Sequence, residues 1–333
     1  MQQATSTSIL FVVALLCSTS ALLGQETSAN AVLGTSLRES PPEELPTKLI
    51  SEQVELLDGI VAAAGEDPEA ELARFKRQAL QSVSVSSGWL ANASGSGLSS
   101  SFVEASVGSG IPLGSLDNIV GVTPRFRVDW IDAGAELDIP SQLYQIETQF
   151  FYRRPINDRW SAMAIFSPSL RSDLSTSDNA VRFFALGLLN WKYIPDRLTL
   201  SGGAVYLGRA DLPVLPALGL TWTPTRATKL DLRFPSSKLA YRLAKDSSRS
   251  EKWLYSSIGL GGNTWAVTRR TGETDEVSLG DIRMMLGVEK LVSGGGGWFL
   301  EGGYAVNRRI EYESDQSEIP LGDAFSLRAG WRY

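Results

Sequence analysis

Histidine is absent from the 333 residues, and the single cysteine, Cys17, lies near the N-terminus inside an apolar segment. The rest of the chain therefore cannot form disulfides, thiol nucleophiles, thiolate or imidazole metal sites, or a Ser-His pair. We expect a protein that is not an enzyme, with no catalytic, cofactor-binding or metal-binding residues and no cofactor.

The sequence also lacks a surplus of basic charge and a long apolar run. Its net charge is −6, and residues 26–79 hold eleven acidic and five basic side chains, which leaves 26 of each sign in residues 80–333. Without a basic field we expect no nucleic-acid partner. No window is apolar over enough residues to be a transmembrane helix. If the chain spans a membrane it must use strands, because only helices and closed barrels satisfy every backbone group in lipid.

The N-terminus is typical of a cleaved export signal. Residues 9–16 are uninterruptedly apolar and are followed by small residues, so we assign residues 1–24 to a signal peptide, with cleavage as late as residue 31. One feature departs from the pattern, since no Lys or Arg precedes the apolar run. A short buried helix or an uncleaved anchor is the alternative. Leu16 stands where a lipoprotein signal needs a small residue, so lipidation of Cys17 is not expected.

We assign residues 25–79 to a periplasmic linker with short helices. Residues 32–46 are polar and rich in proline. Asp67-Pro68-Glu69 is a cap that predicts a helix over 71–80. A helix over 47–64 is predicted from apolar residues at helical spacing: Leu49, Ile50, Val54, Leu57 and Ile60. The whole section is either a mobile leader or a plug across the mouth of a barrel.

From about residue 80 the hydrophobic period changes to two, which predicts strands. The predicted strands are 81–91, 98–108, 118–130, 142–154, 159–169, 180–193, 197–208, 214–223, 227–234, 238–245, 252–268, 279–291, 297–311 and 324–333. Compact turn sequences alternate with longer polar connections, and counting back from Tyr333 puts the compact ones on the side of the C-terminus. This sorting favours an all-β fold: a transmembrane antiparallel up-and-down barrel over residues 80–333.

The strand count has one uncertain point. Pro235-Ser-Ser237 is a short connection on the side of the long loops. It is either a tight hairpin or a bend inside one strand, so we expect 12–14 strands.

The last strand carries an apolar, aromatic-ended face on one parity: Phe325, Leu327, Trp331 and Tyr333. A terminal strand of this kind is typical of bacterial outer-membrane barrels, where the apolar face meets lipid. We interpret these four residues as an assembly signal, and we expect outer-membrane lipid and the barrel assembly machinery as partners. The expected location is the cell outer membrane.

Parity divides the predicted strands into two faces. The outward face is apolar, includes Ile310, and carries aromatic residues near strand ends as an interfacial girdle: Trp130, Tyr152, Trp191, Tyr193, Trp222, Tyr312, Trp331 and Tyr333. A soluble sandwich with an aromatic core is the alternative. The inward face is charged, and the predicted lumen-lining residues are Arg125, Arg127, Asp129, Glu147, Arg182, Lys192, Asp231, Arg233, Arg242, Asp281, Arg283, Glu289, Glu301, Arg309 and Arg328.

Residues 229–333 resemble the uncharacterised outer-membrane barrel families described as domains of unknown function. The segments that carry the resemblance are 230–243, 300–309 and the closing 327–333. The resemblance implies the barrel and its location, and it implies no activity.

The charged inward face predicts a water-filled, porin-like channel for passive diffusion of small polar solutes, with a weak anion preference. Alternatively, its charges pair with one another and hold a closed lumen in a non-catalytic structural or surface-interaction barrel.

Overall fold

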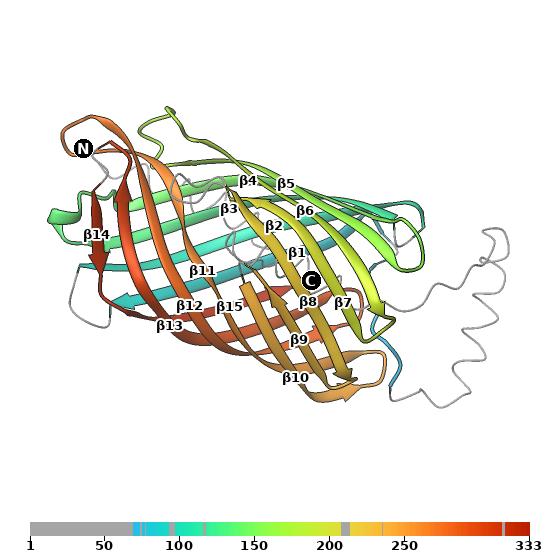
Figure 1. The fold of residues 1–333 in the computed structure, drawn as a ribbon. Helices are drawn as coiled ribbons and strands as arrows, with labels where there is room; N and C mark the ends of the chain where they lie inside the picture. The colour runs from blue at the N-terminus through green and yellow to red at the C-terminus, as the bar shows by residue number, and fades with distance from the viewer. Residues whose placement is uncertain are drawn as a thin grey trace.

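Fourteen antiparallel strands form one closed barrel in the computed structural model (Figure 1). The structure describes residues 69–73, 75–76, 78–92, 97–115, 118–207, 214–234, 236–314 and 317–333. Within them the wall is built from β1 (Leu80–Asn92), β2 (Leu98–Ser115), β3 (Asn118–Ala133), β4 (Gln142–Pro155), β5 (Trp160–Ser172), β6 (Val181–Ile194), β7 (Leu198–Tyr206), β8 (Val214–Thr225), β9 (Thr228–Arg233), β10 (Ser236–Asp246), β11 (Ser250–Thr268), β12 (Thr274–Val292), β13 (Gly296–Tyr312) and β15 (Ala324–Arg332).

Each strand pairs with its neighbour in sequence, and the last strand closes the ring. β15 pairs with β1 through nine residues, from Ser84 opposite Arg332 to Asn92 opposite Ala324, and pairs with β13 on its other side. The short β14 (Glu318–Leu321) adds to the end of β13 outside the ring. β9 and β10 form an antiparallel hairpin, because Ser237 of β10 pairs with Leu232 of β9. The prediction of an up-and-down barrel is therefore confirmed, with the higher of the expected strand counts.

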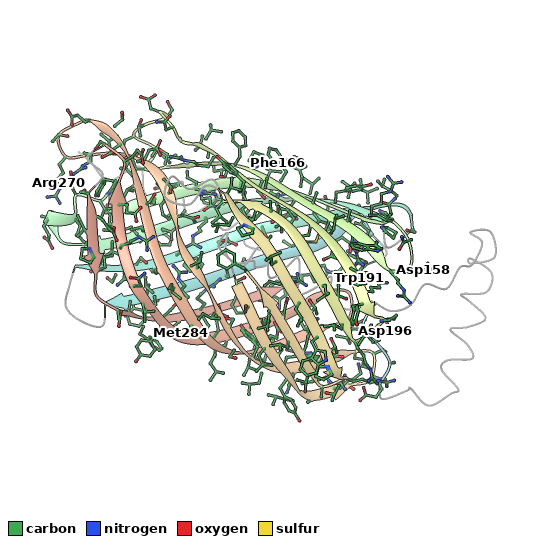
Figure 2. The ribbon with its side chains drawn as sticks, in the orientation of Figure 1. Asp158, Phe166, Trp191, Asp196, Arg270 and Met284 are labelled. Atoms are coloured by element: carbon green, nitrogen blue, oxygen red, sulfur yellow. The ribbon has the colours of Figure 1, made fainter. Side chains whose placement is uncertain are left out.

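The connections are sorted between two ends of the barrel. The turn end carries the connections 156–159, 195–197, 226–227, 247–249 and 293–295, and Tyr333. The loop end carries the long connections, including the 3-10 helix η1 (Ala135–Leu137) and residues 269–273. Figure 2 shows Asp158 and Asp196 at one end and Arg270 at the opposite end. Among the described residues no helix is long and apolar enough to cross a membrane.

Alternating side chains give the wall an apolar outer face and a largely polar inner face. On β4, Ile146 is 51% exposed, whereas its neighbours Gln145 and Glu147 are buried. Phe166 and Met284 point outward in Figure 2. Near the turn end, the outward rings of Trp160 and Trp191 stack with centroids 5.7 Å apart. The outer face thus has the apolar band and the aromatic residues near strand ends that the sequence predicts.

The parity prediction is wrong for the last part of β13. Asn307 has a left-handed φ of 51°, and Asn307 and Arg308 together oppose the single residue Asp281 of β12. Such a bulge shifts every later side chain to the other face. Ile310 and Tyr312, expected to face outward, are instead buried in the interior.

The helix predicted over 71–80 is also wrong, because the described residues 71–73, 75–76 and 78–79 are not helical and β1 begins at Leu80. The backbone of Ala73 bonds to the turn between β12 and β13 instead. Its carbonyl accepts from the Gly294 N–H at 2.8 Å, and its N–H donates to Ser293 Oγ at 3.2 Å. The predicted signal peptide and the predicted helix over 47–64 lie outside the described residues.

Candidate functional site: the lumen and its closed loop end

The inward charges of β2, β3 and β4 form one paired network. Arg125 lies 3.3 Å from Glu147 and 3.5 Å from Glu104, and Arg127 lies 2.6 Å from Asp129. The Arg127 guanidinium also lies over the ring of Phe102, 3.8 Å from its centroid. All these charged groups are buried, so each one depends on its partners for solvation.

A second network joins β11, β13 and β15, and a separate pair lies on β12. Glu301 accepts a hydrogen bond from the Tyr255 hydroxyl at 2.7 Å and lies 3.0 Å from Arg328. Asp281 and Arg283 form a bidentate pair, with both nitrogen–oxygen distances at 2.9 Å. The contacts of Glu301 link three strands, whereas the Asp281–Arg283 pair lies within β12.

Nearer the turn end, the predicted residues Asp231 and Arg233 of β9 and Glu289 of β12 are paired as well. Arg233 lies 2.6 Å from Asp231. Lys238 lies 3.0 Å from Glu289, a contact between β10 and β12.

Arg242 links this wall to the segment that precedes the barrel. It lies 3.5 Å from Glu251, which Lys245 also contacts at 2.7 Å, and it donates to Glu69 at 2.8 Å. The hydrogen bond from Arg242 lowers the pKa of the Glu69 carboxyl below its usual value. Lys76 of the same segment lies over the ring of Tyr333, 3.5 Å from its centroid.

The three remaining predicted lumen residues, Arg182, Lys192 and Arg309, differ in their position and contacts. Arg182 of β6 pairs with Glu276 of β12 at 2.5 Å, a contact across the loop end. Lys192 is half-buried near the turn end of β6. Arg309 does not share the inward face, because it follows the Asn307 bulge; it pairs with Glu311 and lies 3.8 Å from Glu318 of β14.

The structure adds buried charges that the sequence analysis missed. Glu104, Arg171, Glu251 and Arg308 all face the interior. Glu104 shares parity with Phe102 on a predicted strand, so its position was available from alternation. Glu251 lay one residue outside its predicted strand, and Arg308 required knowledge of the bulge.

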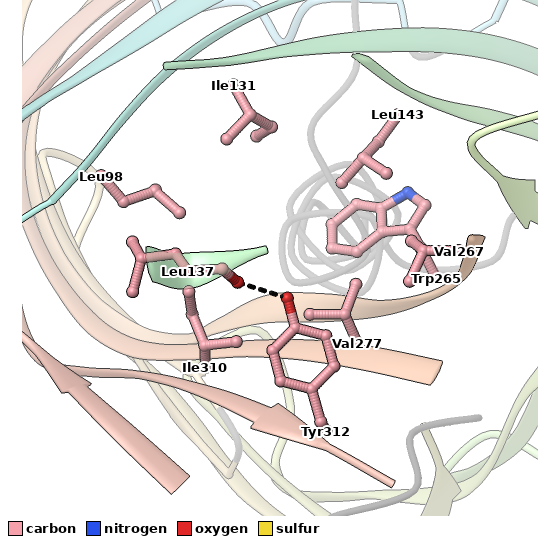
Figure 3. Close-up of a cluster of buried hydrophobic side chains, with 9 residues drawn as sticks. All are labelled: Leu98, Ile131, Leu137, Leu143, Trp265, Val267, Val277, Ile310 and Tyr312. Carbon is pink, nitrogen blue, oxygen red and sulfur yellow. Dashed lines mark hydrogen bonds between the residues drawn. The ribbon is translucent and has the colours of Figure 1, made fainter. Parts of the chain in front are cut away.

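An apolar cluster fills the barrel interior at the loop end (Figure 3). It combines side chains from β2, β3, β4, β11, β12, β13 and η1: Leu98, Ile131, Leu137, Leu143, Trp265, Val267, Val277, Ile310 and Tyr312. We call these nine residues the loop-end cluster. Leu137 reaches it because η1 folds into the mouth, and the Tyr312 hydroxyl donates to the Leu137 carbonyl at 2.6 Å. Closely packed apolar side chains leave few voids as large as a water molecule.

Backbone contacts across the lumen close the same end. β5 and β11 are six strands apart in the wall, yet Ser172 and Ala266 form a parallel bridge. The Asp173 N–H donates to the Ala266 carbonyl at 3.2 Å, and the Thr268 N–H donates to Asp173 Oδ2 at 2.8 Å. The two sides of the barrel therefore touch at the loop end.

Ionic contacts also hold η1 at the loop end, through Asp138 directly after it. Asp138 accepts from Arg269 Nε at 2.9 Å and from the Arg270 N–H at 3.1 Å, and Arg269 also binds Asp275 at 3.0 Å. Burial acts to raise the pKa of the Asp138 carboxyl, but the hydrogen bonds from Arg269 and Arg270 outweigh it and lower the pKa. The contact therefore persists at neutral and mildly acidic pH.

Two cavities lie among the described residues of the barrel interior. A cavity of about 60 Å³ lies beside the loop-end cluster, lined among others by Arg127, Asp281, Arg283, Arg308 and Arg328. A second cavity of about 50 Å³ lies nearer the turn end, beside Met163, Asn190 and Arg233.

One sector of the inner wall is apolar instead of charged. It spans β5 to β8 and consists of Met163, Ile165, Phe184, Leu186, Leu188, Val205 and Ala217. We call it the inner apolar patch. The outer side of the same strands is apolar too, with Phe183 and Leu189 well exposed. The strands are thus apolar on both faces here, which a wall between lipid and water does not require.

The described residues hold no cluster of three or more acidic, histidine or cysteine side chains that would bind a metal ion. The inward charges occur as pairs and short networks, and the loop end is apolar.

Several solved barrels are similar to this chain in outline. The translocator domain of the autotransporter NalP from Neisseria meningitidis matches with 14% identity and a TM-score of 0.34, over 85% of this chain and 94% of that one. The β domain of the Bordetella autotransporter BrkA matches with 8% identity and a TM-score of 0.29, over 77% and 99%. A triple mutant of the Rhodopseudomonas blastica porin matches with 10% identity and a TM-score of 0.23, over 75% and 100%.

These identities and scores are low, so the description of the fold rests on the strand pairing given above. No curated protein matches the chain. A family model matches residues 133–319, from the end of β3 to β14, which is more than half of the sequence. The chain belongs to this family, which is described as a domain of unknown function, DUF6268.

Proposed function

We propose that the chain is a non-catalytic outer-membrane barrel whose lumen is closed and which acts through its exposed surface. The observation that carries this proposal is the loop-end cluster, together with the contact of β5 and β11 across the lumen. A diffusion channel needs a continuous wet path, and nine packed apolar side chains at one mouth oppose it. The outer membrane is the proposed location because the outer face is apolar around the whole ring and carries aromatic residues near strand ends.

A surface role is proposed because the loop end would lie outside the membrane. The loop end carries the long connections, which in an outer-membrane barrel face outside the cell. Residues 269–273 and η1 are held there by the Asp138–Arg269 contact, so they present a fixed surface to a partner. Expected partners also include outer-membrane lipid and the barrel assembly machinery.

The second candidate is a gated channel for small polar solutes. One observation favours it: Leu137 reaches the loop-end cluster from a connection, not from the wall. Movement of this connection would withdraw Leu137 and uncover the charged residues beneath. In this candidate the structure is the closed state of the porin-like diffusion channel that the sequence suggests.

Two measurements test the proposal. Cell fractionation is expected to recover the protein in the outer membrane, with a gel mobility that changes on boiling. Planar bilayers containing the purified wild-type protein are expected to stay silent. Recovery in the soluble periplasm would contradict the location, and discrete current steps from the wild-type protein would contradict the closed lumen.

A further inference from the structure

We propose that residues 47–64 form a helix that lies inside the lumen, with its apolar face on the inner apolar patch. The patch is a continuous surface, since Met163 pairs with Leu188, and Leu186 pairs with both Ile165 and Val205. Phe151, Leu207 and Leu215 extend it. Among the described residues its members come from β4 to β8 and the residue after β7, so it is one face of a sheet. A sheet face of this kind requires a covering layer.

The chain itself supplies a segment of matching chemistry. At 100° per residue, Leu49, Ile50, Val54, Leu57 and Ile60 fall on one side of a helix, together with Leu56 and Val61. Glu52, Glu55 and Asp58 fall on the opposite side. Such a helix would bury one face and present acidic groups from the other.

The lumen has the same two-sided character. The strand order puts β13 and β15 on the far side of the ring from β6 and β7. That far side carries Arg328 on β15, and Arg242 lies on β10, on the flank of the ring between β7 and β15. A helix that packs its apolar face on the patch would turn its acidic face toward these guanidinium groups. Glu69, five residues beyond the segment, already binds Arg242 in this way.

The geometry of the chain permits this placement. A helix of 18 residues is about 27 Å long, similar to the apolar band of an outer-membrane barrel, which is about 25 Å tall. Residues 64 and 69 can be up to about 17 Å apart. The first described residue, Glu69, binds Arg242 of the inner wall near the turn end, and Leu72 is buried. The residues before Glu69 therefore connect to the barrel at its turn end.

Cysteine pairs test the contact. In a Cys17→Ser background, Ile50→Cys, Val54→Cys or Leu57→Cys is each combined with Leu186→Cys, whose side chain belongs to the patch. At least one pair is expected to form a disulfide in the folded full-length protein, identified by its heat-modifiable mobility. The matched control is Leu189→Cys, on the outer face of the same strand and 51% exposed; its pairs are expected to stay reduced. Disulfides in the control alone, or in neither set, would overturn the inference.

A second measurement remains decisive if a double variant folds poorly. Deleting residues 47–64 is expected to raise the rate at which N-ethylmaleimide labels Leu186→Cys about tenfold, with Leu189→Cys unaffected, because a packed layer protects what it covers. Equal rates with and without the segment would overturn the inference.

The inference rests on the proposed closed lumen, which it deepens by adding a second element to the interior. The two fail separately. Current steps from the wild-type protein would refute the closed lumen and leave the disulfide result standing. A silent bilayer without disulfides or protection would refute the helix alone.

Discussion

Leu137→Asp, made in a chain that lacks residues 47–64, is expected to turn a silent barrel into a conducting one. Leu137 is buried at the centre of the loop-end cluster but lies in η1, outside the wall, so the strands can stay paired. An unpaired carboxylate in an apolar interior costs several kcal/mol. Expelling η1 relieves that cost, because the connection can move into water. Planar-bilayer recording should then show discrete current steps.

The control for this variant is Ala135→Asp, which adds the same charge to the exposed side of the same 3-10 helix. It is expected to stay silent. A folded Leu137→Asp variant that is also silent would show that the loop-end cluster alone does not close the lumen. The gated-channel candidate would then lose its support.

The pH response of the same region has a definite sign. The Asp138 pKa is lowered in the folded protein, so its contact with Arg269 contributes stability above the ordinary carboxyl pKa of about 4. That contribution is lost only as the pH falls through the lowered value. Acidification to pH 5 should therefore leave the wild-type barrel closed.

Deleting Trp331 to Tyr333 is expected to reduce the amount of inserted barrel about tenfold or more. β15 closes the ring, and the deletion removes its pairing with Ser84 and Val85 of β1 and the bond from the Tyr333 N–H to the Val83 carbonyl. Unpaired backbone groups at a strand edge cost several kcal/mol each in hydrocarbon. The aromatic end is also the expected recognition signal for assembly.

Deleting residues 32–46 is the comparison, since that segment precedes the barrel and carries no strand prediction. Its loss is expected to leave insertion nearly unchanged. The two yields are compared by the heat-modifiable fraction in outer membranes. Equal yields from both deletions would contradict the role of the last strand.

The barrel was predictable because its signals are local and periodic. Alternation along residues 142–154 and the compact turn at 155–158 each fix a strand and its side without knowledge of the rest. The final strand is predicted from its alternating apolar residues and its aromatic end. Even the inward face of β3 follows from alternation, since Arg125, Arg127 and Asp129 share a parity and are all buried.

The closed loop end was not predictable by the same means. The bulge at Asn307 reverses parity within one strand, and no feature of the alternating pattern reveals a left-handed residue there. Tyr312, predicted to belong to the outer aromatic girdle, therefore lies in the interior. Leu137 lies in a connection without periodicity, so its burial depends on residues far away in the chain. The inner apolar patch could not be predicted from alternation, because residues 183–189 of β6 are apolar on both parities.

The central claim is that the two sides of the barrel meet at the loop end, and one disulfide tests it most directly. Ser172 of β5 and Ala266 of β11 are bridge partners although five strands lie between them in the wall. In a Cys17→Ser background, Ser172→Cys with Ala266→Cys is expected to oxidise to a disulfide in the outer membrane. The control pair, Ser169→Cys with Ala266→Cys, should remain reduced. An open barrel would hold the two Cα atoms on opposite sides of the lumen, beyond the roughly 7 Å that a disulfide can span. A folded protein in which the Ser172–Ala266 pair stays fully reduced would contradict the account.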